Sequence, residues 1–413
     1  MFQLAVFDLD NTLIRTDDLV DIRPLGANNA ASAYIQQVTS RALAHPDRVI
    51  YSLSKLHEIR LKFPDMKFAV FTRSPRSYSI ALLQTFYPDF VWVSLVAYED
   101  VTKTKPSGEG IYTAMKVAGV SDITKVLLIG DSSVDIASAY QAGCWCVLDR
   151  ASWPGSFSKD NWRCMERVPD ADISGPDQLV DFLSDPDSSL PLLEKLLMKG
   201  EGAPNVGSAR IPVINHFDNV DKKPYVSVHV LGRSFSNYEA LNIRRSWHQL
   251  SEQIGELKDA KVFPVTWIEA LRHFLKRQPT VIFGGSVVVT VIPAKPGREP
   301  RMESLLHQLE KSHTSDPVSK VNLLFGNKTS VPGSNLEFFP DILFYLPGAQ
   351  SHSKAHLNAH DRLVNVRDHL RVKNPSAIAG KTVIVFDDVT TTGASLVIAQ
   401  AYMKEAGAKD VIA

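Results

Sequence analysis

VIVFDDVTTTGAS, residues 383–395, combines an apolar run, two adjacent carboxylates and a loop of small hydroxylated residues. An unbroken apolar run predicts a buried parallel strand, and the LVIAQAYMKEAG that follows has the 3.6-residue period of a helix. The loop therefore lies at the N-terminus of a helix, where free backbone N–H groups and the helix dipole favour an anion. Asp387 and Asp388 suit neighbouring hydroxyls or a Mg²⁺-bridged group. The sequence predicts a phosphate-binding loop; an ordinary strand–turn–helix is the alternative.

This stretch closely resembles the loop that binds phosphoribosyl pyrophosphate (PRPP) in type I phosphoribosyltransferases. The resemblance implies that Asp387 and Asp388 bind the ribose hydroxyls. It also implies that the loop residues form a cradle for the 5′-phosphate, namely Thr390, Thr391, Thr392, Gly393 and Ser395. The sequence stops at Ala413 within an expected strand, earlier than is usual in that family, so it resembles either a minimal or a truncated form.

Basic residues upstream are candidates to hold the pyrophosphate. An apolar strand predicted over 287–292 runs into a loop rich in Pro, Gly and basic residues, in the position of the family's pyrophosphate loop. The segment 351–372 resembles the flexible loop and following Arg-x-x-Asn-Val pattern of ComF-like phosphoribosyltransferases. The candidates are Lys295, Arg298, Lys354 and Arg362, with solvated surface charges as the alternative. Four histidines in 351–372 also permit a metal interpretation, but no HExxH-type motif accompanies them.

Polar residues follow four predicted strands in the N-terminal half. The apolar runs cover residues 3–7, 67–71, 91–96 and 126–129. Ligands bind at the carboxyl ends of strands in open α/β sheets, so the residues after these runs are expected to meet. A hydroxyl and an ammonium can neutralise a phosphoryl group, while carboxylates hold Mg²⁺ and supply an attacking oxygen. The residues delivered are Asp8, Asp10, Thr72, Lys105, Asp131 and Asp135. A chance acidic turn is the alternative for the first two.

The ordered set DLDNT, Thr72, Lys105 and GDSSVD resembles the four motifs of the haloacid dehalogenase (HAD) superfamily of phosphatases, over about residues 1–183. The resemblance implies that Asp8 is the nucleophile and Asp10 the general acid/base. It implies that Thr72 and Lys105 hold the phosphoryl group, and that Mg²⁺ is bound by Asp8, by the backbone carbonyl of Asp10 and by Asp131, with Asp135 in support. The interval from residue 12 to 72 is short for a large cap domain.

The composition is that of a globular chain without a net charge. Hydrophobic residues make up 44% and charged residues 22% of the 413 residues. Lys plus Arg equals Asp plus Glu at 45 each, so no overall field favours nucleic acid or an anionic membrane. Three cysteines lack the spacing of a zinc site and are expected to be reduced, namely Cys144, Cys146 and Cys164. Neither a secretory signal nor an apolar run of about 18 residues is present, so a cytoplasmic protein is expected.

The sequence therefore predicts an α/β fold with two doubly wound domains. A HAD-like Rossmannoid domain with a minimal cap is expected over 1–185, a linker over 186–215 and a type I phosphoribosyltransferase domain over 216–413. One continuous helix is expected over 239–258, from apolar residues three and four apart. The pair Arg244–Arg245 on it is expected on a solvated face beside a buried Trp247, with a nucleotide contact as the alternative.

The joint function expected is a bifunctional enzyme of nucleotide metabolism. The C-terminal domain would join a nucleobase-like acceptor to PRPP, and the N-terminal domain, a Mg²⁺-dependent phosphatase, would remove the 5′-phosphate from this phosphomonoester and leave a nucleoside. Two alternatives stay open: a non-catalytic PRPP or nucleotide sensor that regulates the phosphatase, and processing of nucleic-acid ends. Balanced charge argues against the second. Oligomeric state, including a homo-oligomer, is left open.

Overall fold

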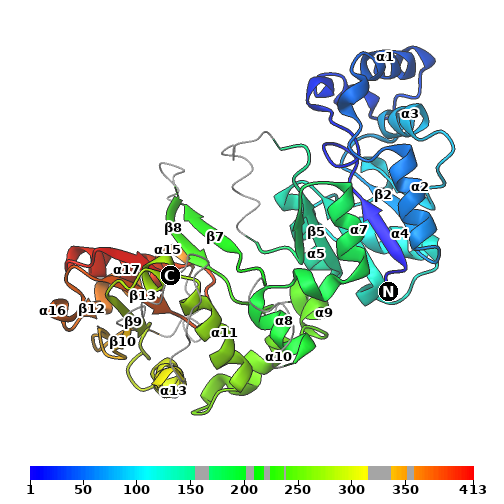
Figure 1. The fold of residues 1–413 in the computed structure, drawn as a ribbon. Helices are drawn as coiled ribbons and strands as arrows, with labels where there is room; N and C mark the ends of the chain where they lie inside the picture. The colour runs from blue at the N-terminus through cyan, green and yellow to red at the C-terminus, as the bar shows by residue number, and fades with distance from the viewer. Residues whose placement is uncertain (154–166, 201–208, 218–223, 237–238, 315–335, 351–357) are drawn as a thin grey trace, which may run out of the picture. The chain divides into compact units, whose positions relative to one another are not determined.

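The computed structural model describes two compact units. The described residues are 1–413 without 154–166, 201–208, 218–223, 237–238, 315–335 and 351–357 (Figure 1). Unit 1 consists of Met1–Leu190 and Phe235–Glu252, and unit 2 of Pro191–Ser234 and Gln253–Ala413. No helix in the described part of the chain is both long and apolar enough to span a bilayer.

Unit 1 is built on a six-stranded parallel sheet in the order β3-β2-β1-β4-β5-β6. The strands are β1 Leu4–Phe7, β2 Lys67–Phe71, β3 Ser94–Val96, β4 Val126–Gly130, β5 Trp145–Asp149 and β6 Ala171–Ile173. Side chains of one strand alternate between the faces: Ala5 and Phe7 enter one core, and Leu4 and Val6 enter the other. The predicted strands at 3–7, 67–71 and 126–129 are confirmed, and the one at 91–96 is shorter than expected.

Helices cover this sheet. They are α2 Leu53–Lys62, α3 Arg76–Phe86, α4 Glu109–Ala118, α5 Ser133–Ala142 and α7 Pro176–Ser184. Between β1 and α2 the chain forms one helix, α1 Ser32–Leu43, and three short turns of 3-10 helix, η1 Asp17–Leu19, η2 Arg23–Gly26 and η3 Pro46–Arg48. Their buried residues, among them Leu19, Ile22 and Val38, join the same core as β1, and α1 packs on α3 (Figure 1). Among the described residues, the insertion therefore has no core of its own.

The segment 235–252 corrects two predictions. The continuous helix over 239–258 is wrong, because the chain forms η9 Glu239–Leu241, α9 Asn242–Arg245, α10 Gln249–Glu256 and η10 Leu257–Asp259. The solvated face is also wrong for Arg244, which is 1% exposed; its Nη1 donates to the carbonyl of Cys144 at 2.6 Å, and its Nη2 pairs with Asp170. Trp247 Nε1 donates to the carbonyl of Gly143 at 2.9 Å. The helix ends after Arg245, and both Arg244 and Trp247 bond to the backbone just before β5, at Cys144 and Gly143.

Unit 2 contains a four-stranded parallel sheet in the order β10-β9-β13-β14. The strands are β9 Val287–Val291, β10 Leu336–Phe338, β13 Thr382–Phe386 and β14 Asp410–Ile412. Two antiparallel pairs stand apart from it: β7 Val213–Phe217 with β8 Pro224–His229, and β11 Leu343–Tyr345 with β12 Leu370–Val372. The apolar segment 343–345 thus forms a strand outside the parallel sheet.

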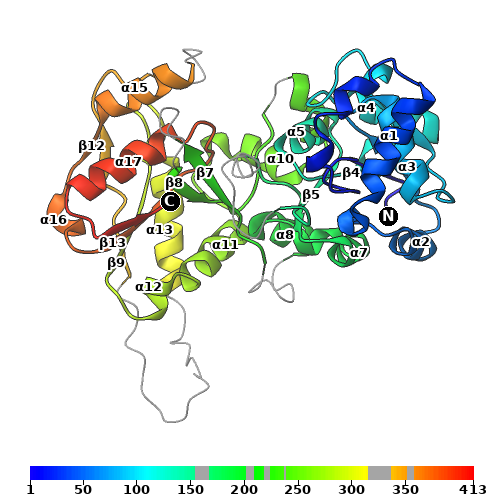
Figure 2. The ribbon, with the colours of Figure 1, turned by 90° about the horizontal axis from the view of Figure 1, so that it is seen from above.

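The helices of unit 2 are α8 Leu192–Lys199, α11 Val265–Lys276, α12 Pro279–Ile282, α13 Arg301–Thr314, α15 Ala359–His369, α16 Pro375–Ile378 and α17 Ala394–Glu405. Of these, α13 and α17 pack against this sheet (Figure 2). Helix α8 lies within the expected linker 186–215 yet is part of unit 2, because Glu194 and Arg233 form an ion pair at 2.6 Å with both side chains 4% exposed. The first stretch of unit 1 therefore ends at Leu190, and residues 235–252 also belong to unit 1.

Candidate functional site

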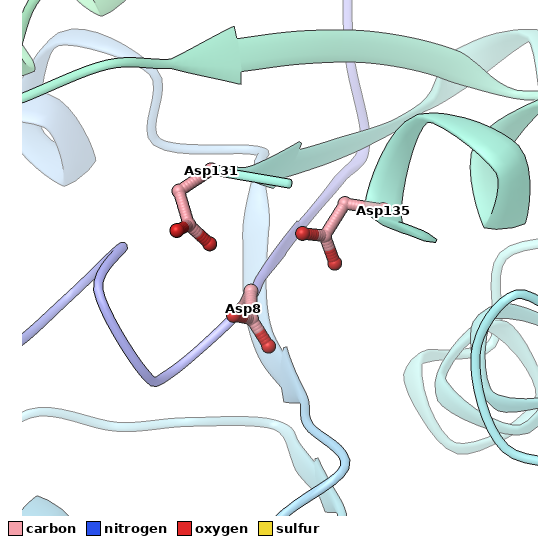
Figure 3. Close-up of side chains that lie close together, drawn as sticks. All are labelled: Asp8, Asp131 and Asp135. Atoms are coloured by element: carbon pink, nitrogen blue, oxygen red, sulfur yellow. The ribbon is translucent and has the colours of Figure 1, made fainter. Parts of the chain in front are cut away.

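Three carboxylates meet at the carboxyl edge of the sheet in unit 1. Asp8 follows β1, Asp131 follows β4, and Asp135 lies in the first turn of α5. One carboxylate oxygen from each lies within 4.8 Å of the others, and Figure 3 shows the three side chains directed at a common space. Strands β1 and β4 are paired parallel neighbours, so residues that follow them share this edge. Among the described residues this is the one group with the spacing of a metal site.

Lys105 completes the cluster. Its Nζ lies 2.5 Å from Asp8 Oδ1 and 2.7 Å from Asp135 Oδ1, and the residue is 4% exposed. Burial raises the pKa of Asp8 to about 7, although the Lys105 ammonium opposes this shift. Burial also raises the pKa of Asp131 well above its usual range, with a further rise from the charge of Asp135. One ammonium facing two buried carboxylates and one half-buried carboxylate leaves a deficit of positive charge.

A divalent cation fits this deficit. Mg²⁺ prefers hard oxygen ligands, and Asp8, Asp131 and Asp135 present carboxylate oxygens within reach of one ion. The buried cluster fits the predicted Mg²⁺ site; that the backbone carbonyl of Asp10 takes part stays a prediction.

Asp10 lies two residues beyond Asp8, yet its carboxylate is engaged elsewhere. Hydroxyl groups donate to both of its oxygens: Thr16 at 2.7 Å and Tyr78 at 3.1 Å to Oδ1, Ser74 at 2.5 Å and Thr72 at 3.4 Å to Oδ2. These donors come from the loop after β2, from α3 and from the loop after β1, so the orientation of Asp10 is fixed by three segments of the chain. The sequence singled out Thr72; Thr16, Ser74 and Tyr78 had no motif to identify them.

The second predicted site lies at the carboxyl edge of the sheet in unit 2. Strands β9 and β13 are parallel neighbours, and Phe386 pairs with Val291, so the loops after them start side by side. Asp387 and Asp388 follow β13, and Gly393, with φ at 71°, precedes α17. That left-handed conformation favours glycine. Burial raises the pKa of Asp387 well above its usual value, and the charge of Asp388 adds to the shift.

Basic side chains gather around this loop. Arg362 Nη1 donates to Thr391 Oγ1 at 3.0 Å, and Lys295 Nζ donates to the carbonyl of Gln350 at 2.7 Å. Burial lowers the pKa of Lys295 to about 8; Asp387 opposes that shift, and the nearby cations Arg298 and Arg362 add to it. The structure thus brings three of the four pyrophosphate candidates together, and the fourth, Lys354, lies outside the described residues.

Arg301 is a residue that the sequence interpretation missed. It begins α13, and its Nη1 lies 2.8 Å from Asp388 Oδ2 with the Arg301 side chain 11% exposed. Its buried Nε and Nη2 atoms have no hydrogen-bond partner among the described residues. The histidines give no second centre in the described part of the chain: His369 Nδ1 contacts the carbonyl of Asn365 at 2.8 Å, and His352 and His356 fall outside it.

The fold and site of unit 1 define a hydrolase-type α/β domain with an acidic centre. The model of the haloacid dehalogenase-like hydrolase family matches residues 25–148, which include Thr72, Lys105, Asp131 and Asp135. The N-terminal region therefore contains a HAD-type hydrolase domain. Asp8 and Asp10 precede the matched range. No curated protein matches the chain.

Solved structures are similar to part of this chain. A predicted phosphoglycolate phosphatase from Haemophilus somnus 129PT has 18% identity and a TM-score of 0.31, covering 44% of this chain and 98% of its own. A putative β-phosphoglucomutase from Thermotoga maritima has 16% identity and a TM-score of 0.33, covering 45% and 99%. CbbY from Rhodobacter sphaeroides, in complex with phosphate, has 16% identity and a TM-score of 0.32, covering 43% and 96%. These values are too low to establish a shared activity.

Proposed function

We propose that unit 1 is a Mg²⁺-dependent phosphomonoester hydrolase that works through an aspartyl-phosphate on Asp8. The observation that supports this most is the surroundings of Asp8: Lys105 contacts it, the carboxylates of Asp131 and Asp135 lie within 4.8 Å, and Asp10 is two residues away in the chain. This set supplies a nucleophile, a cation for the phosphoryl oxygens and a separately held acid/base.

The reaction has two steps. A carboxylate oxygen of Asp8 attacks phosphorus, the bond from phosphorus to the ester oxygen breaks, and Asp10 gives its proton to the departing alcohol. Asp10 then removes a proton from water, which attacks the phosphorus of the aspartyl-phosphate, and inorganic phosphate and free Asp8 are released. Bound Mg²⁺ supplies charge neutralisation for the phosphoryl oxygens and for Asp8.

The protein groups divide the remaining work. Lys105 is buried and touches both Asp8 and Asp135, so its ammonium holds the nucleophile in place and faces the incoming phosphoryl group. Thr72 donates to Asp10 in the free protein and lies at the end of β2, within reach of the same space. Preorganised charge of this kind acts without reorganisation in the transition state.

Hydrolysis of p-nitrophenyl phosphate tests this function. Wild type with Mg²⁺ should release p-nitrophenol, and Asp8→Asn should lose at least about a thousandfold of this rate while it keeps the wild-type thermal unfolding transition. Asp47→Asn is the control for loss of one aspartate charge, because Asp47 is exposed and lies in the insertion between β1 and α2. An Asp8→Asn protein as active as wild type would refute the aspartyl-phosphate.

A second function is proposed for unit 2: binding of PRPP and transfer of its phosphoribosyl group to a nucleobase-like acceptor. It is supported by Asp387 and Asp388 at the end of β13, and by Lys295 and Arg362 beside the following loop. In the transfer, the C1–pyrophosphate bond breaks as the acceptor nitrogen forms its bond to C1. The cations stabilise the leaving pyrophosphate while positive charge develops on the ribose.

If both functions hold, the product of unit 2 is a phosphomonoester that unit 1 can hydrolyse to a nucleoside. Mass spectrometry of products from Mg²⁺, PRPP and a pool of nucleobases tests this coupling. Wild type should give a nucleoside, and Asp8→Asn should stop at its 5′-phosphate. If neither protein forms a glycosylated product, but PRPP alters the rate of phosphate release, unit 2 is a sensor and not a transferase.

A further inference from the structure

We infer that Arg23 selects substrates whose leaving alcohol carries a second oxyanion, a carboxylate or a phosphate. The inference rests on the phosphohydrolase function proposed for unit 1 and names the substrate class of that site. Arg23 begins the short η2 turn in the insertion after β1, a segment to which no motif in the sequence assigns a role.

The turn that carries Arg23 is held firmly. Ile22, just before it, is 3% exposed and belongs to the core. Tyr34 Oη donates to the carbonyl of Ile22 at 3.1 Å, and Ser77 Oγ donates to the carbonyl of Gly26 at 2.8 Å. Both ends of the turn are therefore tied to helices α1 and α3, so the Arg23 side chain leaves a fixed point of the backbone.

The guanidinium of Arg23 points to the catalytic centre, and its N–H donors are not used in hydrogen bonds within the described structure. Its Nη1 lies 3.6 Å from Asp10 Oδ1, longer than a hydrogen bond, and its side chain is 28% exposed. In the described structure Arg23 makes no side-chain hydrogen bond, whereas the other arginines of the insertion are engaged. Arg48 forms two bonds with Asp18, and Arg41 bonds Asp21 at 2.7 Å.

Asp10 does not need Arg23 as a hydrogen-bond donor. Four hydroxyl groups already reach its two oxygens, as described above. Arg23 therefore adds a cation next to an acid/base that is already oriented. The Arg23 side chain is 28% exposed, so a ligand can reach its guanidinium.

The place of Arg23 beside Asp10 decides which part of the substrate it meets. Asp10 protonates the ester oxygen, so groups next to Asp10 face the leaving alcohol and not the transferring phosphoryl, which lies at Asp8 and Lys105. A guanidinium presents paired N–H donors that match a carboxylate or phosphate. An oxyanion on the alcohol is therefore the partner that the position and chemistry of Arg23 favour.

Matched esters test the inference with the full-length protein. The carboxylate pair is 3-phosphoglycerate and glycerol 3-phosphate, which differ by a carboxylate in place of a hydroxymethyl group. The phosphate pair is propanediol bisphosphate and 3-hydroxypropyl phosphate, and p-nitrophenyl phosphate is the baseline. Wild type should prefer at least one anionic member by about tenfold to a hundredfold in kcat/KM, the range for hydrogen bonds to a charged group. The pair that shows it identifies the anion.

Variants at Arg23 separate substrate recognition from a purely structural role. Arg23→Gln should abolish the preference between the members of a pair, and Arg23→Lys should keep part of it. Arg41→Gln, in the same insertion but bonded to Asp21, should leave the preference intact. Equal losses on all esters with Arg23→Gln would make Arg23 a positioning residue for Asp10 and overturn the inference.

The wild-type data distinguish this inference from the function on which it rests. Release of p-nitrophenol without any preference within either pair overturns the role of Arg23, while the phosphohydrolase function stands. If wild type hydrolyses none of the five esters, the proposed hydrolase function fails, and the role of Arg23 fails with it.

Discussion

Replacement of Arg244 by alanine should destabilise unit 1 more than any neighbouring surface change. Arg244 is 1% exposed, its guanidinium pairs with Asp170, whose side chain is fully buried, and it donates to the carbonyl of Cys144. It also lies 4.0 Å from the ring centroid of Trp247. Cys144 and Asp170 directly precede strands β5 and β6, so the Arg244 side chain joins segment 235–252 to the sheet of unit 1.

The expected cost is about 3–5 kcal/mol in the free energy of unfolding of unit 1, because Arg244→Ala leaves a buried carboxylate without its guanidinium. Loss of the cation–π contact adds about 1 kcal/mol. Urea denaturation followed by hydrolysis of p-nitrophenyl phosphate measures this, since activity reports on unit 1 alone. Two units need not unfold in one transition, so a signal specific to one of them is required.

Arg245→Ala is the matched control. Arg245 is half-buried and donates one bond, to the carbonyl of Phe235 at 3.2 Å, so its loss should cost about 1 kcal/mol. Adding Asp170→Asn to Arg244→Ala should recover part of the loss, because the buried charge is removed with its partner. If Arg244→Ala costs no more than Arg245→Ala, segment 235–252 does not stabilise unit 1 and its assignment to that unit is refuted.

Three further predictions concern other parts of the chain. Mg²⁺ should raise the melting temperature of unit 1, and Asp131→Asn should reduce that rise in a thermal-shift titration; equal shifts in both proteins would exclude Asp131 from the metal site. Gly143 and Gly119 both end helices with positive φ, and alanine there costs about 1–2 kcal/mol. A Cβ on Gly143 would also lie 2.5 Å from Ile243, while one on Gly119 meets nothing within 4 Å. Denaturation should therefore show a larger loss of stability for Gly143→Ala than for Gly119→Ala. Equal losses of stability would contradict this contact. Finally, because burial lowers the pKa of Lys295 to about 8 and only the protonated amine attracts an anion, pyrophosphate affinity measured by calorimetry should fall as pH rises through about 8, and Lys295→Gln should lack this fall. An unchanged pH profile in Lys295→Gln would remove Lys295 from the anion site.

The strands and the acidic centre of unit 1 were predictable from local sequence. Apolar runs such as Val126–Gly130 mark buried parallel strands, and residues that follow them lie at one edge of the sheet by geometry. Asp8, Lys105, Asp131 and Asp135 meet for this reason, as the sequence predicted. The same rule placed Asp387 beside Lys295, because their strands β13 and β9 are parallel neighbours.

The failures concern residues whose roles depend on partners far along the chain. A helical period was visible in 239–258, but the break after Arg245 follows from contacts with Gly143 and Asp170, which no local pattern records. The attachment of α8 to unit 2 depends on a distant partner in the same way, because Glu194 pairs with Arg233, 39 residues away.

The sequence by itself determined which strands form and which residues stand at their ends, because periodicity and chain direction are local properties. Only the tertiary structure decided what surrounds those residues: the four hydroxyls on Asp10, the pairing of Arg301 with Asp388, and the approach of Arg23 to the centre. These contacts join positions that are distant in the sequence, and packing of whole elements, not the spacing of residues, brings them together.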